Sequence, residues 1–291
     1  MYKIVDWIDK DDIEKLDWIW LSSNPMAVYL LEQNLDKIIW FGLSGNPNAL
    51  FILEKYPKEI NWTKLSENSG AIYLLEQHPE KIDWFFLHRN RSSRAIYLLE
   101  QNIDKIHWYW LSGNPYAISL LEKHLDKINW IWLSENPEAI HLLEQYPEKI
   151  EWTCLSGNPN AIKLLEQNID KIDWMYLSGN PNAIKLLEQN MDKINWEKLS
   201  GNINAMDLLE KNMDKINWYW LSENPSAIAL LKKYPEKINW NALSRNPNLF
   251  ILDYQWLENR MNIIKEELIS VALHPDRIAY WIKQGMKISD M

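Results

Sequence analysis

Tryptophan returns along this chain with a step of 22 residues, and this period constrains the fold more than any other feature. One step, between Trp84 and Trp108, is 24 residues long. A leucine follows each of these tryptophans three residues later, without exception. A fixed period of about 20 to 50 residues is typical of stacked repeats, so we predict eleven repeats whose tryptophans are structural. These are Trp18, Trp40, Trp62, Trp84, Trp108, Trp130, Trp152, Trp174, Trp196, Trp218 and Trp240.

Each repeat contains the start signal of a helix. Asn precedes a run such as NAIKLLEQN in ten repeats, and Ser92 holds the corresponding place after the long step. The side chain of Asn or Ser can cap a free backbone N–H, and the Pro that often follows is well tolerated at the first helical position. Within the run, Ile184 and Leu187 lie on one apolar face. We therefore predict a helix of roughly ten residues.

A second, shorter helix is predicted around each tryptophan. Asn or Asp stands immediately before Trp in most repeats and provides another cap. Trp and Leu at positions i and i+3 fit a helix of one to two turns, partly 3₁₀ in character. Helices this short cannot bury their apolar sides alone, so stability must come from stacking each repeat on the next.

The predicted fold is all-α, an α-solenoid or superhelix of about eleven 22-residue two-helix repeats over residues 16–252. With neighbouring helices ~8 to 10 Å apart, the repeats would form a rod or superhelix roughly 90 Å along its path. Because a solenoid exposes its ends, we predict an N-terminal cap over residues 1–15 and a C-terminal helical cap over residues 253–291. The C-terminal segment contains a long amphipathic helix and a second helix beginning at His274. A role of this segment in docking a partner or in dimerisation stays open.

The repeat WxxLSxNPxAIxLLExNxDKIxW resembles the leucine-rich repeat variant family over residues 16 to about 252. It is more similar still to short Asn-Pro-Ala-Ile repeat proteins of large DNA viruses of protists. These resemblances imply units that pair an α-helix with a 3₁₀ or short helix, and they imply no particular activity. The 22-residue step and the constant Trp depart from the variant family, which leaves the pitch and handedness of the superhelix open. The richness in Ile, Asn and Lys is compatible with an AT-rich viral genome.

We expect function at the positions that vary between repeats. Two sets of equivalent positions, which we call columns, stand out. The first column is the position just before the Leu pair of the longer helix, where four consecutive repeats carry an aromatic residue. Two interpretations are open: an exposed aromatic stripe that binds a partner, or packing between turns of the superhelix. The stripe consists of Tyr29, Phe51, Tyr73 and Tyr97.

The second column lies two residues after each repeated Trp and varies widely in size and charge. Its aromatic members can line a concave recognition face, or they can cover the junction between repeats. Cys154 belongs to this column, and the sequence places no fixed His or Asp partner beside it. The partner-binding candidates are Trp20, Trp110, Trp132 and Trp220.

The 24-residue step adds a third candidate. It contains His88 and sets Arg89, Arg91 and Arg94 close together in an acidic chain. An Arg cluster can bind a carboxylate, a phosphate or an acidic peptide through paired hydrogen bonds. The alternative is an insertion without a function, whose charged side chains only face solvent. The loop adjoins the stripe that ends at Tyr97, so the stripe and the cluster can form one site.

Composition and the absence of motifs narrow the function. The net charge of −9 argues against a broad phosphate-binding surface, and the single cysteine fits a reducing compartment. We find no signal peptide, no apolar run long enough to span a bilayer, no metal-ligand spacing and no phosphate-binding loop, so no membrane, metal or cofactor is expected. The expected location is cytoplasmic, in the host cytoplasm or the virion if the source is viral.

The leading prediction is a non-enzymatic protein–protein interaction scaffold, because a repeat surface with unit-specific side chains suits binding. One alternative is a structural or self-assembling virion component that forms a homo-oligomer. The other is nucleic-acid binding by aromatic columns that stack bases, which the acidity disfavours. An enzyme is not expected, because nothing pairs a nucleophile with a base and an orienting group.

Overall fold

The computed structural model describes residues 2–272, 274, 277, 278 and 283. The chain forms two compact units, one of residues 4–250 and one of residues 1–3 with 251–291. The first unit contains all eleven repeats, and each repeat begins with a short helix at its tryptophan. These helices are α2 (Trp18–Ser23), α4 (Trp40–Ser44), α6 (Trp62–Ser66), α8 (Trp84–Leu87), α10 (Trp108–Leu111), α12 (Trp130–Glu135), α14 (Trp152–Gly157), α16 (Trp174–Gly179), α18 (Trp196–Ser200), α20 (Trp218–Glu223) and α22 (Trp240–Leu243).

A second helix follows in ten repeats. It is shorter than predicted, because the residue before it, such as Ala183 with φ −90° and ψ 1°, interrupts the α geometry after the Asn-Pro turn. In five repeats that turn is itself 3₁₀: η3 (Ser69–Ala71), η6 (Pro115–Ala117), η8 (Pro137–Ala139), η13 (Pro225–Ala227) and η15 (Pro247–Leu249). The second helices are α3 (Val28–Glu32), α5 (Leu50–Lys55), α7 (Ile72–Gln77), α9 (Ser93–Glu100), α11 (Ile118–Glu122), α13 (Ile140–Gln145), α15 (Ile162–Glu166), α17 (Ile184–Glu188), α19 (Met206–Glu210) and α21 (Ile228–Lys233).

A one-turn 3₁₀ helix then leads from each second helix to the next tryptophan. The cap predicted before Trp is present in most repeats; the Asp173 carboxylate, for example, accepts from the N–H groups of Met175 and Tyr176. The turns are η1 (Leu35–Lys37), η2 (Pro57–Glu59), η4 (Pro79–Lys81), η5 (Ile103–Lys105), η7 (Leu125–Lys127), η9 (Pro147–Lys149), η10 (Ile169–Lys171), η11 (Met191–Lys193), η12 (Met213–Lys215) and η14 (Pro235–Lys237).

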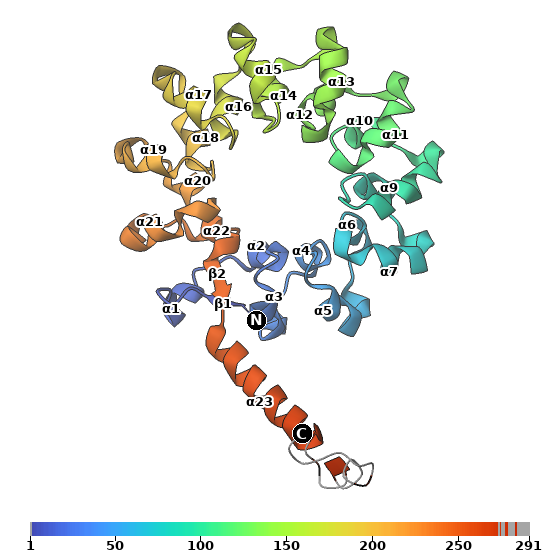
Figure 1. The fold of residues 1–291 in the computed structure, drawn as a ribbon, viewed down its shortest axis with the longest axis vertical. Coiled ribbons are helices and arrows are strands. Elements are labelled where there is room, and N and C mark those ends of the chain that lie inside the picture. Colours follow the sequence, from blue (N-terminus) through green and yellow to red (C-terminus); the bar gives the residue numbers. More distant parts are fainter. Residues whose placement is uncertain (1, 273, 275–276, 279–282, 284–291) are drawn as a thin grey trace. The chain divides into compact units, whose positions relative to one another are not determined.

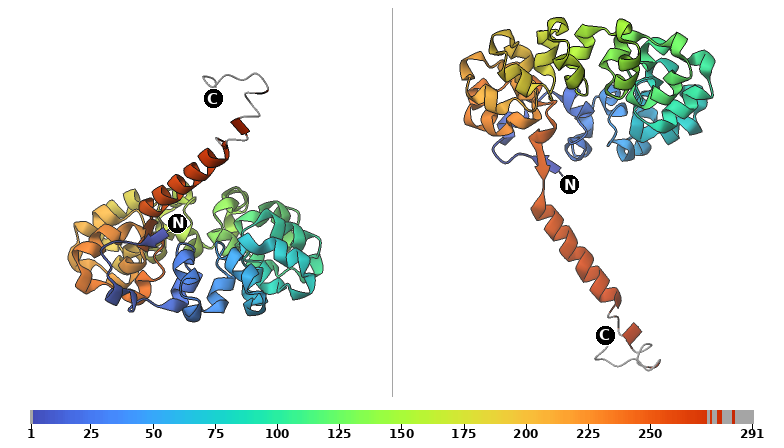
Figure 2. Two further views of the ribbon diagram at one scale, coloured as in Figure 1. Left: turned by 90° about the horizontal axis from the view of Figure 1, so that it is seen from below. Right: turned by 45° about the horizontal axis from the view of Figure 1, so that its top comes forward.

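The repeats form a closed ring. The tryptophan helices surround a central opening and the second helices lie on the periphery (Figure 1). The chain makes one circuit, and α22 of the last repeat comes to lie beside α2 of the first (Figures 1 and 2). The Asn24 Nδ2 donates to the backbone oxygens of Ser244 and Asn246, 3.1 and 3.2 Å away. The prediction of an open rod or superhelix is therefore wrong, because the first and last repeats bond to each other.

A ladder of buried asparagines carries the stacking from repeat to repeat. Each ladder Asn donates to two backbone oxygens of the preceding repeat; Asn180, for example, donates to Ser156 and Asn158 at 3.1 and 2.8 Å. Its own Oδ1 accepts from the N–H two residues later, at 3.0 Å. The two donated bonds are buried and the accepted bond is partly buried, and an unsatisfied polar group is costly in such a place. The ladder comprises Asn24, Asn46, Asn68, Asn90, Asn114, Asn136, Asn158, Asn180, Asn202, Asn224 and Asn246.

The N-terminal segment completes the eleventh repeat, which has no second helix of its own. Val5 N–H donates to the Leu249 oxygen at 3.0 Å, and the side chains of Val5, Ile8 and Leu16 are buried. Leu16 stands two residues before Trp18, as Ile38 stands before Trp40. Residues 1–15 were predicted to cover an exposed end, but residues 5–16 instead close the ring, which has no end to cover. This segment also contains α1 (Lys10–Ile13).

The eleven tryptophans are half-buried, while the fully buried core is made of the Leu, Ser, Asn and Ala columns between the two helix layers. Each indole is covered in one of two ways. Where Asn precedes the 3₁₀ turn that follows the second helix, a Lys ammonium lies over the indole, as Lys37 does over Trp18 at 4.8 Å. Where Tyr or His stands at this position, its ring contacts the indole, as in Tyr56 and Trp40, whose ring centroids lie 5.6 Å apart. The eleventh, Trp240, is covered by Lys15 from the N-terminal segment at 5.1 Å.

A two-stranded sheet is formed by β1 (Tyr2–Ile4) and β2 (Phe250–Leu252). Ile4 and Phe250 belong to the first unit, and the other residues of the two strands belong to the second unit. It also contains the long helix α23 (Tyr254–Ala272), in the segment predicted to be a helical cap. The second helix predicted from His274 onward falls almost entirely outside the described residues. No helix among the residues that the structure describes is long and apolar enough to span a membrane.

Candidate functional site

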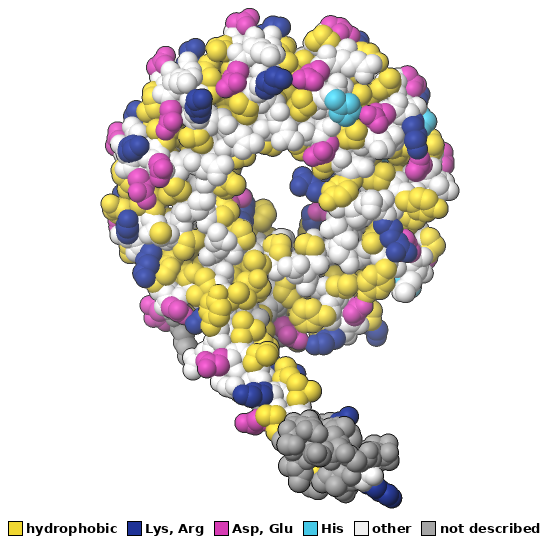
Figure 3. Space-filling model, viewed as in Figure 1, with side chains coloured by type: hydrophobic (Ala, Val, Ile, Leu, Met, Phe, Trp, Pro, Cys, Tyr) yellow, Lys and Arg dark blue, Asp and Glu magenta, His cyan; other side chains and the backbone are white. Residues whose placement is uncertain are grey.

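The inner wall of the ring presents three variable columns. In each tryptophan helix the residues three and four positions after Trp are buried against the second layer. A helix turns by about 100° per residue, so the residues one, two and five positions after Trp lie on the opposite side, facing the opening. The opening persists when side chains are drawn, with apolar and charged groups around it (Figure 3). The second column of the sequence analysis is therefore part of this wall.

Side chains of adjacent repeats contact each other along this wall. The residue five positions after one Trp packs against the residue two positions after the next Trp, and the pair can be a glycine beside a large side chain or two large side chains that stack. A Cβ on Gly113 would lie 3.5 Å from the Trp132 ring, whereas the Arg245 guanidinium stacks on Trp20 at 3.4 Å. The column thus covers the junctions between repeats and also lines the wall, and its use in recognition stays a prediction.

The largest concentration of aromatic side chains on the wall spans the fourth, fifth and sixth repeats. Ring centroids lie 4.9 Å apart for Trp110 and Trp132, 5.9 Å apart for Tyr109 and Trp132, and 5.9 Å apart for Phe85 and Trp110. Phe85 also contacts Phe86 at 5.6 Å. We call these five residues, Phe85, Phe86, Tyr109, Trp110 and Trp132, the aromatic cluster.

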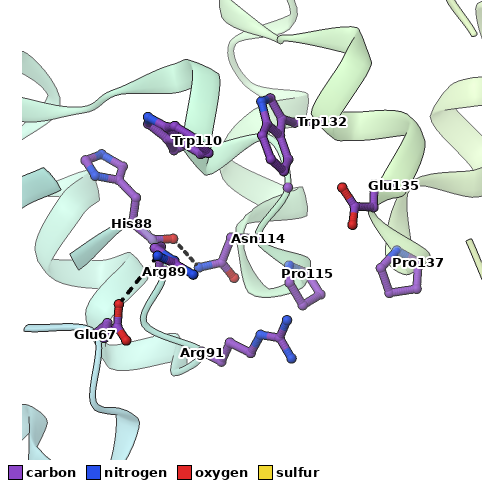
Figure 4. Close-up of a pocket in the computed structure, with 11 residues that line it drawn as sticks. Glu67, His88, Arg89, Arg91, Trp110, Asn114, Pro115, Trp132, Glu135 and Pro137 are labelled. Carbon is purple, nitrogen blue, oxygen red and sulfur yellow. Dashed lines mark hydrogen bonds and ion pairs between the residues drawn. The ribbon is translucent and has the colours of Figure 1, made fainter. Parts of the chain in front are cut away.

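A cavity of about 740 Å³ opens beside the aromatic cluster (Figure 4). Trp110 and Trp132 line one side of it, and Arg89 and Arg91 line the other, together with Glu67 and Glu135 at its two ends. Arg89 lies 3.8 Å from a Glu67 oxygen, and Lys64 pairs with the other oxygen of the same carboxylate. Hence Arg89 has only a distant ion pair.

A second cavity of about 430 Å³ is built in the same way on the other side of the ring. Trp220 forms its apolar wall, and Gly201 of the preceding repeat leaves the room for it. The Trp220 Nε1–H donates to Glu197 at 3.0 Å, and Arg245 pairs with Glu223 at 3.2 Å. Because these charges are paired within the wall, this cavity offers less to a charged ligand than the first.

The 24-residue step is accommodated without a break in the ladder. Asn90, and not Ser92, occupies the ladder position, and Ser92 caps the N-terminus of α9. His88 takes the place that Ser holds in the other repeats. Its Nε2 accepts from the His107 N–H at 2.7 Å, so this nitrogen carries no proton. Its Nδ1 then donates to the Phe85 oxygen at 3.3 Å.

Burial lowers the pKa of His88 below its ordinary value of 6.5. The unfolded chain therefore binds more protons at this site than the folded chain, and the stability that neutral His88 provides is lost as the pH falls below 6.5 through the folded-state pKa. We expect the unfolding free energy of wild type to decrease relative to that of His88→Ser as the pH falls over this window, measured by urea unfolding at several pH values. A difference that is independent of pH would contradict the assignment of a neutral, buried imidazole.

Cys154 lies half-buried in the same wall column. Burial, followed by the nearby carboxylates Glu135 and Glu151, raises the pKa of its thiol above the ordinary value. The thiolate is the reactive form, so Cys154 should react with a thiol-specific reagent at pH 7 to 8 several-fold more slowly than a free cysteine, with a rate that climbs as the pH increases. A rate equal to or above that of free cysteine would contradict this environment.

The predicted site residues do not form a single site. The stripe Tyr29, Phe51, Tyr73 and Tyr97 lies on the second helices α3, α5, α7 and α9, at the periphery (Figure 1). Arg94 lies in the first turn of α9 and pairs with Glu76 on α7, away from Arg89 and Arg91. The structure brings Arg89, Arg91, Trp110 and Trp132 together, and places Trp220 in the second cavity and Trp20 under Arg245.

Sequence reasoning missed Phe85, Tyr109 and the carboxylates Glu67 and Glu135, whereas Phe86 belongs to the second column. The signal for Phe85 and Tyr109 was the position one residue after each Trp, which is apolar in seven of eleven repeats. No group of three His, Cys, Asp or Glu side chains that could hold a metal ion occurs in the part of the chain that the structure describes.

Comparison of the chain with protein-family models, curated proteins and solved structures finds no match. The resemblance of the repeat to short viral Asn-Pro-Ala-Ile repeat proteins therefore stays a prediction.

Proposed function

We propose that this chain is a non-enzymatic protein-interaction module whose inner wall binds an extended polypeptide segment of a partner. The observation that carries the proposal is the aromatic cluster beside Arg89 and Arg91 in the first cavity. The segment that fits this chemistry carries apolar side chains next to a carboxylate. A reducing compartment such as the cytoplasm is part of the same proposal, since the sequence has one cysteine.

Aromatic and arginine side chains dominate the binding energy of protein interfaces when they are clustered. In the aromatic cluster, Trp110 is 37% and Tyr109 48% exposed, so apolar area is available for burial. Arg89 and Arg91 are exposed in the same cavity and can form charge-assisted hydrogen bonds with a carboxylate. A partner segment with only apolar residues would leave these arginines unused, and one with only acidic residues would leave the rings exposed.

The test is selection from a displayed random-peptide library against the full chain. We expect enriched sequences that combine an aromatic or aliphatic residue with Asp or Glu. Against the selected peptide, the Arg89→Ser/Arg91→Ser variant and the Trp110→Ala variant should each raise the Kd about tenfold or more, because each removes interactions of about 1.5 to 3 kcal/mol. The matched control is Tyr29→Ser/Tyr73→Ser/Tyr97→Ser on the peripheral helices, which should leave the Kd unchanged.

Four results would overturn the proposal. The first is that the library yields no enriched sequence. The second is that the selected peptides bind the two inner-wall variants as tightly as wild type. A single-stranded oligonucleotide can also displace the peptide with strong salt dependence, which would favour base stacking on the aromatic cluster instead. Loss of binding by the peripheral variant alone would move the site to the outer stripe.

A further inference from the structure

The helix α23 carries an apolar stripe with the spacing of a coiled coil. Apolar residues follow one another at alternating steps of three and four, which places them at positions a and d of a heptad repeat. Three of them, Tyr254, Met261 and Leu268, are 73%, 62% and 64% exposed. The described stripe is Tyr254, Leu257, Met261, Ile264 and Leu268.

The stripe of α23 has the geometry of a helix-packing surface. Most of the stability of a helix in water comes from packing of its apolar side, and among the described residues the a positions of this stripe are exposed and its d positions are half-buried. A strict a/d stripe is narrower than the face of a helix that packs on a globular core, and it fits a second helix with the same spacing.

The charges beside the stripe distinguish two ways of pairing α23 with itself. Glu258 and Lys265 lie at position e, and Arg260 and Glu267 lie at position g. In a parallel pair, position g faces position e of the next heptad, so Arg260 would face Lys265 of the second copy. In an antiparallel pair, e faces e and g faces g. Glu258 then faces Lys265, and Arg260 faces Glu267, so every pair joins opposite charges.

We propose that α23 binds α23 of a second copy of this chain as an antiparallel two-helix coiled coil. In this register Met261 packs against Ile264 of the second copy, and Leu257 packs against Leu268. The arrangement also keeps the residues that precede α23 in the two copies about 28 Å apart, the length of a 19-residue helix. This inference uses none of the residues of the inner wall and is independent of the function proposed for them.

The first test is the mass of the full chain by sedimentation equilibrium over about 1 to 200 µM, a range suited to a short coiled coil. Wild type should approach twice the chain mass of 34.8 kDa at the higher concentrations. Met261→Ser/Leu268→Ser should remain at the mass of one chain. The matched control is Ile263→Ser, an exposed apolar residue on the same helix but outside the stripe, which should dimerise like wild type. A wild type that stays monomeric throughout, or a stripe variant that dimerises like wild type, would overturn the proposal.

The second test distinguishes the orientation. Arg260→Glu should weaken the antiparallel dimer about tenfold, because two Arg260–Glu267 attractions become repulsions. Adding Glu267→Arg to the same chain should restore the affinity. In a parallel dimer Arg260→Glu would instead face Lys265 and tighten the association, and that result would refute the antiparallel arrangement. Unchanged thermal unfolding of the ring in each variant separates these effects from misfolding.

Discussion

Replacing Asn24 by alanine should destabilise the protein as much as replacing Asn180, by about 3 to 5 kcal/mol in each case. Asn180 lies in the middle of the chain and Asn24 in the first repeat, yet each donates two buried hydrogen bonds and accepts one. Alanine would remove the side-chain donor from the buried serine oxygen of the preceding repeat and the acceptor from one N–H, and it would leave the preceding ladder oxygen with only its own turn bond. In an open solenoid Asn24 would have no preceding repeat to bond, and its replacement would cost little.

Urea unfolding followed by tryptophan fluorescence measures both variants. Asn182→Ala is the matched control, because its side chain is exposed and makes a single bond to the Pro159 oxygen at 2.9 Å. Its loss should cost less than about 1 kcal/mol. If Asn24→Ala resembles this control while Asn180→Ala is strongly destabilised, the ring is open in solution.

Deleting residues 1–16 should lower the melting temperature by about 15 °C or more. The deletion exposes the surfaces that Val5, Ile8 and Leu16 cover, each worth about 2 kcal/mol of apolar burial, and a protein of this size loses about 2 to 4 °C per kcal/mol. It also removes the Val5 bond to Leu249 and the Lys15 cover of Trp240. Differential scanning calorimetry measures the loss of stability, and small-angle scattering shows whether the ring opens.

Lys15→Ala is the control for this deletion. It removes the cation–π contact with Trp240 and leaves the buried side chains in place, so it should cost no more than about 1 kcal/mol. A deletion variant that melts like Lys15→Ala would show that the N-terminal segment is not needed to complete the eleventh repeat.

The local structure of each repeat could be predicted from the sequence, because it depends on residues close together in the chain. The caps at Asp173 and Asn180 are formed by side chains that bond the backbone two or three residues later. The Asn90 and Ser92 roles were misassigned, since in the other repeats one Asn serves both as ladder residue and as cap, and only the insertion separates the two.

The candidate site was predicted in part. The sequence analysis singled out Trp110, Trp132, Arg89 and Arg91. It also expected the arginine cluster to join the stripe that ends at Tyr97, and this expectation was not met. Arg91 and Arg94 are three residues apart, yet the insertion carries one to the inner wall and the other to α9 at the periphery. Such a separation depends on which side of the ring each helix layer faces, and no local pattern records it.

The sequence by itself determined the number of repeats, their two-helix pattern and the caps of their helices, whereas the structure showed that the same asparagines join one repeat to the next. Only the tertiary structure decided that eleven repeats make one closed circuit, which requires a turn of about 33° at each junction. The physical reason is that a small rotation at each junction accumulates over all eleven. A few degrees more or less would give an open superhelix from the same local contacts, and the pairing of Asn24 with Ser244 selects the ring.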